Sequence, residues 1–207
     1  SVKAIDKDFE PRFVKRSVGA DSSLQQRWYC GGYATIQGHA LPGIVGVGAY
    51  DEHPEYFAEI NGERIREKTQ LCLSNPDVLA LVKQRVLEEL RAQSDATLFS
   101  VSQDDNYNGC TCAKCRAVDT AEGSMAGSMI RFVNAVAEAV EKEFPDVLVQ
   151  TFAYQYTSKP PKYTKARKNV LIRYCTMDAC FRHPITDPNC ETNAKRFYKE
   201  MMEWQDK

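Results

Sequence analysis

A short apolar stretch at residues 97–101 constrains the fold of this chain more than any other part of its sequence. Its residues, Thr-Leu-Phe-Ser-Val, are rich in strand formers and lie between polar residues, which predicts a buried strand. Five consecutive side chains that can hydrogen-bond follow at 102–106, and three cysteines lie within 110–115. In a parallel α/β protein, the loop between a strand and its helix is where ligands bind. The stretch therefore predicts a sugar or metal site at the end of a strand.

The rest of the chain alternates between strand and helix patterns. Apolar residues at helical spacing predict helices at 76–92, from about residue 125 to before Pro145, and from about residue 192. Strands are expected near 12–14, 70–73, 97–103, 147–154 and 169–175, and the segment 29–36 is expected to form a strand or a close-packed loop. The residues at 39–43 are expected to form a loop, and Asn61-Gly62 a tight turn. This alternation favours a parallel sheet covered by helices.

Such a sheet is either doubly wound or part of a (β/α) barrel. No glycine-rich phosphate fingerprint follows any strand pattern, which weakens the nucleotide-binding version. A complete barrel needs about 250 residues, whereas this chain has 207. We therefore expect one α/β domain over 1–207, an incomplete TIM-type (β/α) barrel of five or six parallel strands with covering helices.

Composition excludes several classes of function. The formal net charge is −1 and no Lys/Arg run is present, so no nucleic-acid partner is expected. The apolar runs are too short for a membrane span. The eight cysteines do not settle the redox compartment. The chain opens at Ser1 without a signal-peptide pattern, as expected of a processed product or a fragment.

Aspartates follow two of the expected strands. A glycosidase needs two carboxyl groups, one as general acid and one as base or nucleophile. Asp104 and Asp105 follow one strand and Asp178 another, so in a barrel all three are candidate catalytic residues on one face. Adjacent residues of an extended segment point in opposite directions, so we expect at most one of Asp104 and Asp105 to face a pocket. The alternative is that these aspartates cap a helix or fix the loop.

Side chains suited to sugar recognition are expected near the same edge, namely His39, Gln103, Tyr154, Gln155, Tyr156 and His183. Aromatic faces stack on sugar rings, while amide and phenol groups hydrogen-bond to sugar hydroxyls. The alternatives are a core role for one of the two tyrosines and a structural, hydrogen-bonded role for each histidine.

The spacing Cys110-x-Cys112-x2-Cys115 is close to that of a metal knuckle, with Cys175 or Cys180 as the candidate fourth thiolate. A zinc ion held in this way would be structural, because a closed thiolate site leaves no open coordination position. A disulfide within the loop or to Cys180 and plain reduced thiols are the alternatives. No cofactor is required for catalysis on this interpretation.

Several ordered stretches resemble a known family, namely 53–57, 70–76, 99–105, 110–115, 131–136, 153–157 and 175–184. They are similar to a bacterial family of uncharacterised, glycoside-hydrolase-like proteins, distant relatives of the α-glucuronidases of glycoside hydrolase family sixty-seven. The resemblance covers roughly residues 9–185. It implies the central part of a TIM-type barrel, attached to other modules of exported proteins, and hence a periplasmic or extracellular location. It brings no settled list of catalytic residues.

Two hypotheses about function follow. The first is a glycoside-hydrolase-like domain that hydrolyses or binds a glycan through carboxylates and aromatic residues. The second is a non-catalytic carbohydrate-binding module, or a structural fragment of a larger exported protein. On either hypothesis the last barrel units are missing, and the open sheet edges predict self-association or contact with other modules.

Overall fold

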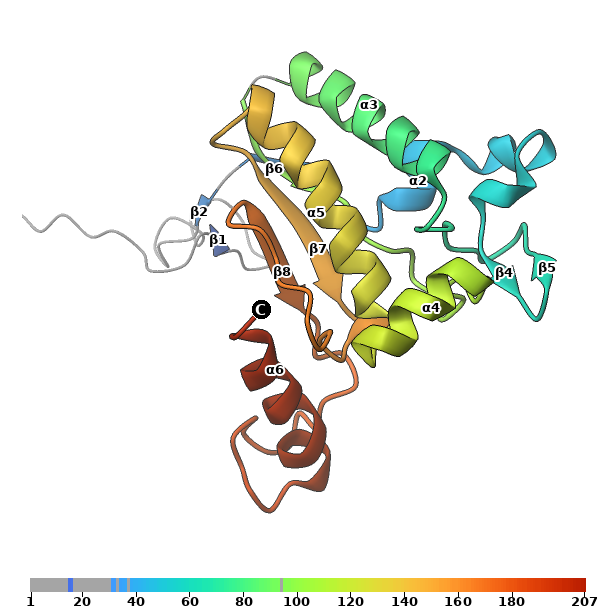
Figure 1. Ribbon diagram of the computed structural model, residues 1–207. Coiled ribbons are helices and arrows are strands. Elements are labelled where there is room, and N and C mark those ends of the chain that lie inside the picture. Colours follow the sequence, from blue (N-terminus) through green and yellow to red (C-terminus); the bar gives the residue numbers. More distant parts are fainter. Residues whose placement is uncertain (1–14, 17–30, 33, 37, 94) are drawn as a thin grey trace, which may run out of the picture. The chain divides into compact units, whose positions relative to one another are not determined.

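The computed structural model describes residues 15–16, 31–32, 34–36, 38–93 and 95–207 (Figure 1). The chain divides into two units, residues 1–34 and 35–207. In the first unit, β1 (Lys15–Arg16) pairs antiparallel with β2 (Gly31–Gly32). The strand expected at 12–14 lies outside the described residues.

A parallel sheet organises the second unit. Strand β6 (Ala96–Ser100) pairs with β7 (Leu148–Ala153), and β7 pairs with β8 (Val170–Tyr174), each time in parallel. Strand β3 (Ala34–Ile36) extends the order to β3–β6–β7–β8. Within the described residues, these strands close no barrel, and they are fewer than the five or six parallel strands that we expected. The fold class is therefore mixed α/β, with a short open sheet.

The expected strand at 70–73 is the clearest difference from the sequence prediction. Leu71 forms only an isolated bridge with Phe57, and Cys72 donates its backbone N–H to the carbonyl of Tyr56. The partner of this segment is thus an irregular stretch and not a neighbouring strand of the main sheet. That stretch leads into the hairpin of β4 (Glu59–Ile60) and β5 (Glu63–Arg64).

The turn of this hairpin confirms the prediction for Asn61-Gly62. Asn61 has a φ of 52° and Gly62 a φ of 87°, the two positive values that a tight hairpin turn of this kind requires. Asparagine and glycine tolerate this conformation better than other residues do.

The helices predicted at 76–92 and from about residue 125 are confirmed closely, and the structure contains further helices that the sequence did not predict. The helices are α2 (Leu41–Val45), α3 (Pro76–Ala92), α4 (Ala113–Glu122), α5 (Ala126–Glu143), a π-helical stretch (Asn193–Tyr198) and α6 (Lys199–Trp204). Short 3-10 helices lie at Val47–Asp51, Pro54–Tyr56 and Gln155–Thr157. Helix α2 takes the place of the loop expected at 39–43, and α4 begins directly after Cys112 and contains Cys115, in a segment for which we predicted no helix.

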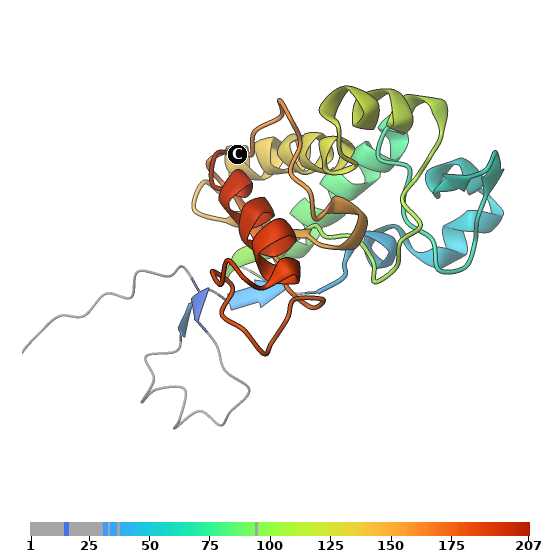
Figure 2. The same cartoon turned by 90° about the horizontal axis from the view of Figure 1, so that it is seen from below.

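Helices α3 and α5 lie side by side and contribute much of the main core (Figures 1 and 2). Their buried stripes face the same cluster of side chains, which includes Phe99 of β6 and Val149 of β7. The stripe of α3 consists of Val78, Val82, Val86 and Leu90, as its helical spacing predicts. The side-chain oxygen of Asn75 accepts hydrogen bonds from the backbone N–H groups of Asp77 and Val78, at 2.9 and 3.4 Å, and caps the helix.

A smaller cluster joins α6 to the sheet. Trp204 packs with Ile130 of α5 and Ala153 of β7, and its indole N–H donates to the carbonyl of Ser158 at 2.7 Å. The last helix is thereby held against the segment that follows β7. Among the described residues, no helix combines the length and apolar character that crossing a bilayer requires.

Candidate functional site

Polar side chains meet where β6 and β7 end. Since the two strands are parallel neighbours, the residues that follow them leave the sheet at the same edge. The Asp105 carboxylate accepts hydrogen bonds from the Tyr154 hydroxyl at 3.0 Å and from Gln155 Nε2 at 2.9 Å. We call His39, Asp105, Tyr154 and Gln155 the strand-end cluster.

The Tyr154 phenol is bonded to Asp105 and also lies within the electrostatic influence of Asp178. Partial burial raises the pKa of its phenol, and so do the hydrogen bond that the hydroxyl donates to Asp105 and the negative charges of Asp105 and Asp178. The phenol therefore stays protonated and donates to Asp105. Asp178 is exposed in the segment after β8, close enough to act electrostatically on the same phenol.

His39 reaches the cluster because its segment is bound to the end of β6. The backbone N–H groups of Ala40 and Leu41 both donate to the carbonyl of Ser102, at 3.1 and 3.0 Å. His39 Nδ1 lies 2.7 Å from the carbonyl of Gln103, so Nδ1 must carry the proton and Nε2 is the acceptor of the neutral ring. The imidazole lies 6.3 Å from the Tyr154 ring, centroid to centroid.

The backbone of Gln155 adopts an uncommon conformation. Its φ is 52°, in the left-handed region that a residue with a β-carbon rarely occupies. Its Oε1 atom is buried without a hydrogen-bond partner among the described residues. Strain and an unsatisfied polar atom at one residue are typical of functional sites, where a bound ligand or water completes the bonding.

Three predicted site residues have structural contacts instead of facing solvent at this edge. Gln103 is fully buried, donating to the carbonyl of Tyr154 at 2.6 Å and accepting from Thr157 Oγ1 at 2.7 Å. Asp104 accepts from Asn106 Nδ2 at 3.2 Å within its own loop. Tyr156 has a buried hydroxyl whose pKa is raised by desolvation, and its ring packs on Gly109. These residues hold the loop, and the ligand contacts predicted for them stay predictions.

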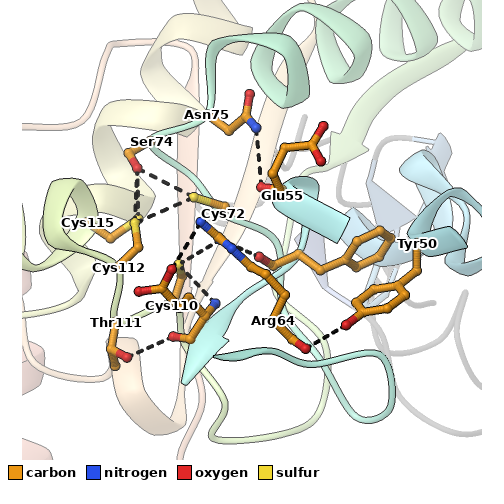
Figure 3. Close-up of polar contacts among 12 residues, drawn as sticks. Tyr50, Glu55, Arg64, Cys72, Ser74, Asn75, Cys110, Thr111, Cys112 and Cys115 are labelled. Carbon is orange, nitrogen blue, oxygen red and sulfur yellow. Dashed lines mark hydrogen bonds and ion pairs between the residues drawn. The ribbon is translucent and has the colours of Figure 1, made fainter. Parts of the chain in front are cut away.

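The second feature of the site is a group of four buried thiols, which we call the four-cysteine centre (Figure 3). Its sulfur atoms all lie within 4.8 Å of one another and belong to Cys72, Cys110, Cys112 and Cys115. The exposed fraction of each residue is between 1% and 7%. Neither Cys175 nor Cys180, the two residues expected as candidate fourth thiolates, belongs to this group, and Cys72 is its fourth member.

The geometry of this centre fits a tetrahedral metal ion. With zinc–sulfur bonds of about 2.3 Å, ligand sulfurs of a tetrahedral site lie about 3.8 Å apart. The Cys72 and Cys112 sulfurs are 3.7 Å apart, close to that value and far beyond the ~2.05 Å of a disulfide. All four thiols are free. The centre can therefore hold a thiophilic metal such as zinc, and its burial leaves no open coordination position.

Neighbouring groups complete the surroundings of the sulfur atoms (Figure 3). The Glu59 backbone N–H and the Arg64 guanidinium both donate to the Cys110 sulfur, at 3.4 and 3.8 Å. The Cys115 thiol donates to the Ser74 hydroxyl at 3.2 Å, and the same hydroxyl lies 3.6 Å from the Cys112 sulfur. The N–H donors on Cys110 stabilise a thiolate, and neighbouring polar groups of this kind orient metal ligands.

Contacts among the thiols separate their pKa values. Hydrogen bonding from Cys110 and Cys115 lowers the pKa of Cys72, whereas hydrogen bonding to Cys110 and Cys72, together with burial, raises the pKa of Cys115. One thiolate thus forms readily, and further ones need a compensating positive charge. A divalent cation would provide it.

A cavity of about 440 Å³ borders the centre and offers an entry path. It lies where α3 and α4 begin, beside the β4–β5 hairpin, and does not include the strand-end cluster. Cys72, Cys112 and Arg64 are among the residues that line it.

Sequence spacing did not identify Cys72. It lies 40 residues before Cys112, outside any knuckle pattern. The only local indication was its place in the apolar segment 70–73, which we interpreted as a strand. The His183 Nδ1 atom lies 3.2 Å from the Cys180 sulfur, and the sugar contact predicted for His183 stays a prediction.

A buried carboxylate that the sequence did not single out anchors the loop after β7. Glu122 has a side chain with 0% exposure and forms an ion pair with Arg131 at 2.6 Å. It also accepts from the backbone N–H groups of Tyr163 and Thr164 and from the Thr164 hydroxyl, at 2.8, 3.1 and 2.6 Å. Burial opposes its charge, but these hydrogen bonds prevail and lower its pKa to about 2.

Comparisons with known proteins place the chain in a family. No curated protein matches it. Among solved structures, it resembles the tandem GH20 catalytic modules in the pneumococcal exo-β-D-N-acetylglucosaminidase StrH, with a TM-score of 0.43 and 17% sequence identity. The match covers 70% of this chain and 33% of that one, so the chain spans about a third of the length of this distant relative. Residues 4–206 match the family described as "Domain of unknown function (DUF4838)", and the chain belongs to this family.

Proposed function

We propose that this domain binds a carbohydrate at the strand-end cluster, as part of a glycoside-hydrolase-like, carbohydrate-active protein. The observation that carries the proposal is the Asp105 carboxylate, which is exposed and flanked by the Tyr154 phenol and the Gln155 amide. A carboxylate, an amide and an aromatic ring at one edge of a parallel sheet are the groups that read sugar hydroxyls and stack on sugar rings.

Asp105 is the proposed principal ligand for a sugar hydroxyl. Its carboxylate has two oxygens, each with more than one acceptor position, so it can keep its bonds to Tyr154 and Gln155 and accept another. His39 adds an aromatic ring with an acceptor nitrogen at Nε2. The unsatisfied Gln155 Oε1 would gain a partner from a bound hydroxyl or water.

Hydrolysis needs a second carboxyl group across the bond to be cleaved. We propose Asp178 for this role, because its charge acts on the same Tyr154 phenol as that of Asp105. A non-catalytic carbohydrate-binding module is the second candidate. It is favoured by the observation that Asp104, the neighbour of Asp105, is engaged within its own loop.

We further propose that the four-cysteine centre holds a structural zinc ion. The loop between β6 and α4 carries Asp105 and, further along, Cys110 and Cys112, and Cys115 follows in the first turn of α4. A metal that ties this loop to Cys72 would fix the path of the chain on which Asp105 lies. The zinc would take no part in the reaction, since the buried centre has no open position.

Glycan binding is testable on the 207-residue chain. A glycan array identifies the best ligand, and calorimetry then compares its affinity for the wild type, D105N and Y154F. We expect D105N to weaken binding about tenfold or more, because a hydrogen bond to a charged group contributes roughly 1.5–3 kcal/mol. Y163F is the matched control, since Tyr163 is an exposed tyrosine with 64% exposure.

Release of reducing sugar from the same glycan separates the two candidates. A hydrolase loses turnover in both D105N and D178N, while a binding module releases no sugar even as the wild type. Unchanged affinity in D105N and Y154F would remove the strand-end cluster from consideration.

A further inference from the structure

We propose that Cys180, His183 and Cys190 form a second zinc site, whose fourth coordination position is open to solvent. This site is separate from the four-cysteine centre and does not depend on the carbohydrate proposal. We call it the Cys-His-Cys site. It lies in the segment between β8 and the π-helical stretch.

The three ligand atoms already lie together. Each residue contributes one ligand atom, and the three atoms from Cys180, His183 and Cys190 all lie within 4.8 Å of one another. The Cys180 sulfur is 3.2 Å from His183 Nδ1. In a tetrahedral zinc site, with bonds of about 2.3 Å to sulfur and about 2.0–2.1 Å to nitrogen, ligand atoms are separated by somewhat less than 4 Å. Small side-chain rotations therefore bring all three into coordination distance.

A buried asparagine holds the backbone of this segment in place. Asn193 is 0% exposed, and its Oδ1 accepts from the backbone N–H of Cys180 at 2.9 Å. Its Nδ2 donates to the carbonyls of Cys180, His183 and Pro184, at 3.0, 3.1 and 3.2 Å. One side chain thus fixes the positions of two of the three ligands before any metal binds. Preorganisation of this kind lowers the entropic cost of coordination.

Cys190 is held from the other side. Its backbone N–H donates to the carbonyl of Asp187 at 3.1 Å, and its carbonyl accepts from the N–H of Ala194 at 2.8 Å. Cys190 is therefore tied to the helical turn that also carries Asn193. The side chain is buried, with 6% exposure, so its sulfur faces the interior of the segment.

The chemistry of the ligands selects the metal. Two thiolates and one imidazole favour zinc over calcium or magnesium, which prefer oxygen ligands. His183 is exposed and Cys180 partly exposed, so the fourth position faces water. Three protein ligands with a solvent ligand are the arrangement of zinc sites that exchange a water molecule or bind an anion. The four-cysteine centre, by contrast, is closed.

Zinc content of the 207-residue chain tests this proposal. The protein is purified with a thiol reductant, incubated with zinc, desalted and measured by elemental mass spectrometry. We expect about two zinc ions in the wild type and about one in H183A and in C190S. H53A is the matched control and should keep about two, because His53 lies outside both cysteine groups. His183 is exposed, so H183A is expected to fold normally.

Cobalt substitution provides a second readout. The wild type would bind cobalt through four thiolates of one site and two of the other. Loss of the Cys-His-Cys site in H183A should therefore reduce the sulfur-to-cobalt charge-transfer absorption by about a third.

The outcomes distinguish this site from the four-cysteine centre. One zinc in the wild type and none in H183A would support the Cys-His-Cys site and reject the other. Equal zinc content in the wild type, H183A and C190S would overturn the proposal. A disulfide between Cys180 and Cys190 would also overturn it, because the two sulfurs would no longer be available to zinc. Such a disulfide would lower the intact mass of the protein by two hydrogens in reducing buffer, and digestion would yield a peptide cross-linked through Cys180 and Cys190.

Discussion

Replacing Glu122 by glutamine tests how the loop after β7 is held beside the candidate site. The Glu122 carboxylate is buried, and it accepts hydrogen bonds from Arg131, from the Thr164 hydroxyl and from two backbone N–H groups. Glutamine has nearly the same shape, but one of its oxygens is replaced by an NH₂ group. That group would face a donor, so at least one buried N–H is left without an acceptor.

The pKa of Glu122 sets the magnitude of the effect. Its decrease from 4.5 to about 2 corresponds to roughly 3 kcal/mol of preference for the charged form in the folded protein. Arg131 is half exposed, at 52%, so water screens part of its contribution. We therefore expect E122Q to lower the free energy of unfolding by about 2 kcal/mol near pH 7.

The pH dependence of this loss follows from the direction of the shift. The folded-state pKa is lowered, so the stabilisation is fully present above the unfolded value of 4.5 and disappears as the pH falls to about 2. The difference in stability between the wild type and E122Q should therefore shrink over that interval. A glutamate that is protonated in both states provides no advantage over glutamine.

Urea denaturation at several pH values measures this effect. With a slope of roughly 1–3 kcal/mol per molar urea, a loss of about 2 kcal/mol moves the midpoint by about 1 M. E138Q is the control, because Glu138 lies on the exposed surface of α5. Equal midpoints for E122Q and E138Q near pH 7, or a difference that persists unchanged at low pH, would refute the reasoning.

Three further predictions concern packing, capping and association. G109A should lower the free energy of unfolding, measured by urea titration, by about 1–3 kcal/mol. The β-carbon of the new alanine would lie 2.5 Å from the Met125 side chain and 2.9 Å from the Tyr156 ring. The control is G43A, whose β-carbon would meet nothing within 4 Å and should leave the stability unchanged. N75A should lose about 1 kcal/mol by removing the cap of α3, whereas N75D should keep most of it; equal losses would exclude capping as the cause. The open sheet predicts concentration-dependent self-association of the 207-residue chain in sedimentation velocity, and a monomer at all concentrations with a high melting temperature would contradict it.

The sequence predicted well those elements whose local pattern agrees with their tertiary environment. Helix α3 has a capping residue, a proline at its start and an apolar stripe, and its predicted bounds of 76–92 match those in the structure. Strand β7 is buried along nearly its whole length, and β8 begins with the apolar run Val-Leu-Ile and pairs with it in parallel. In these segments, local propensity and packing favour the same structure.

Elements whose structure depends on distant contacts were not predictable in this way. The segment 70–73 has a strand-like composition, but it packs against residues 56–58 and brings Cys72 to the other thiols. Helix α4 was missed because it begins within the cysteine cluster and buries few apolar residues. Cys180, His183 and Cys190 do lie near one another along the chain, but we assigned Cys180 to the other cysteines and His183 to a sugar site, so this grouping was missed.

The grouping of the candidate site residues was predictable only in part. Asp105, Tyr154 and Gln155 follow neighbouring parallel strands, and strand-end residues must meet at one edge. Whether a side chain turns toward solvent or into the loop depends on hydrogen bonds that form only in three dimensions. Gln103 illustrates this, since its amide is bonded to Tyr154 and Thr157 on the next strand's loop.

The central claim of this account is that four buried thiols bind one zinc ion and so order the loop that presents Asp105. X-ray absorption spectroscopy at the zinc edge tests it most directly, and the H183A variant isolates this centre from the Cys-His-Cys site. We predict about one bound zinc per chain with four sulfur neighbours at about 2.3 Å and no nitrogen or oxygen ligand. A metal-free H183A protein, or a zinc with two or fewer sulfur neighbours, would contradict the claim.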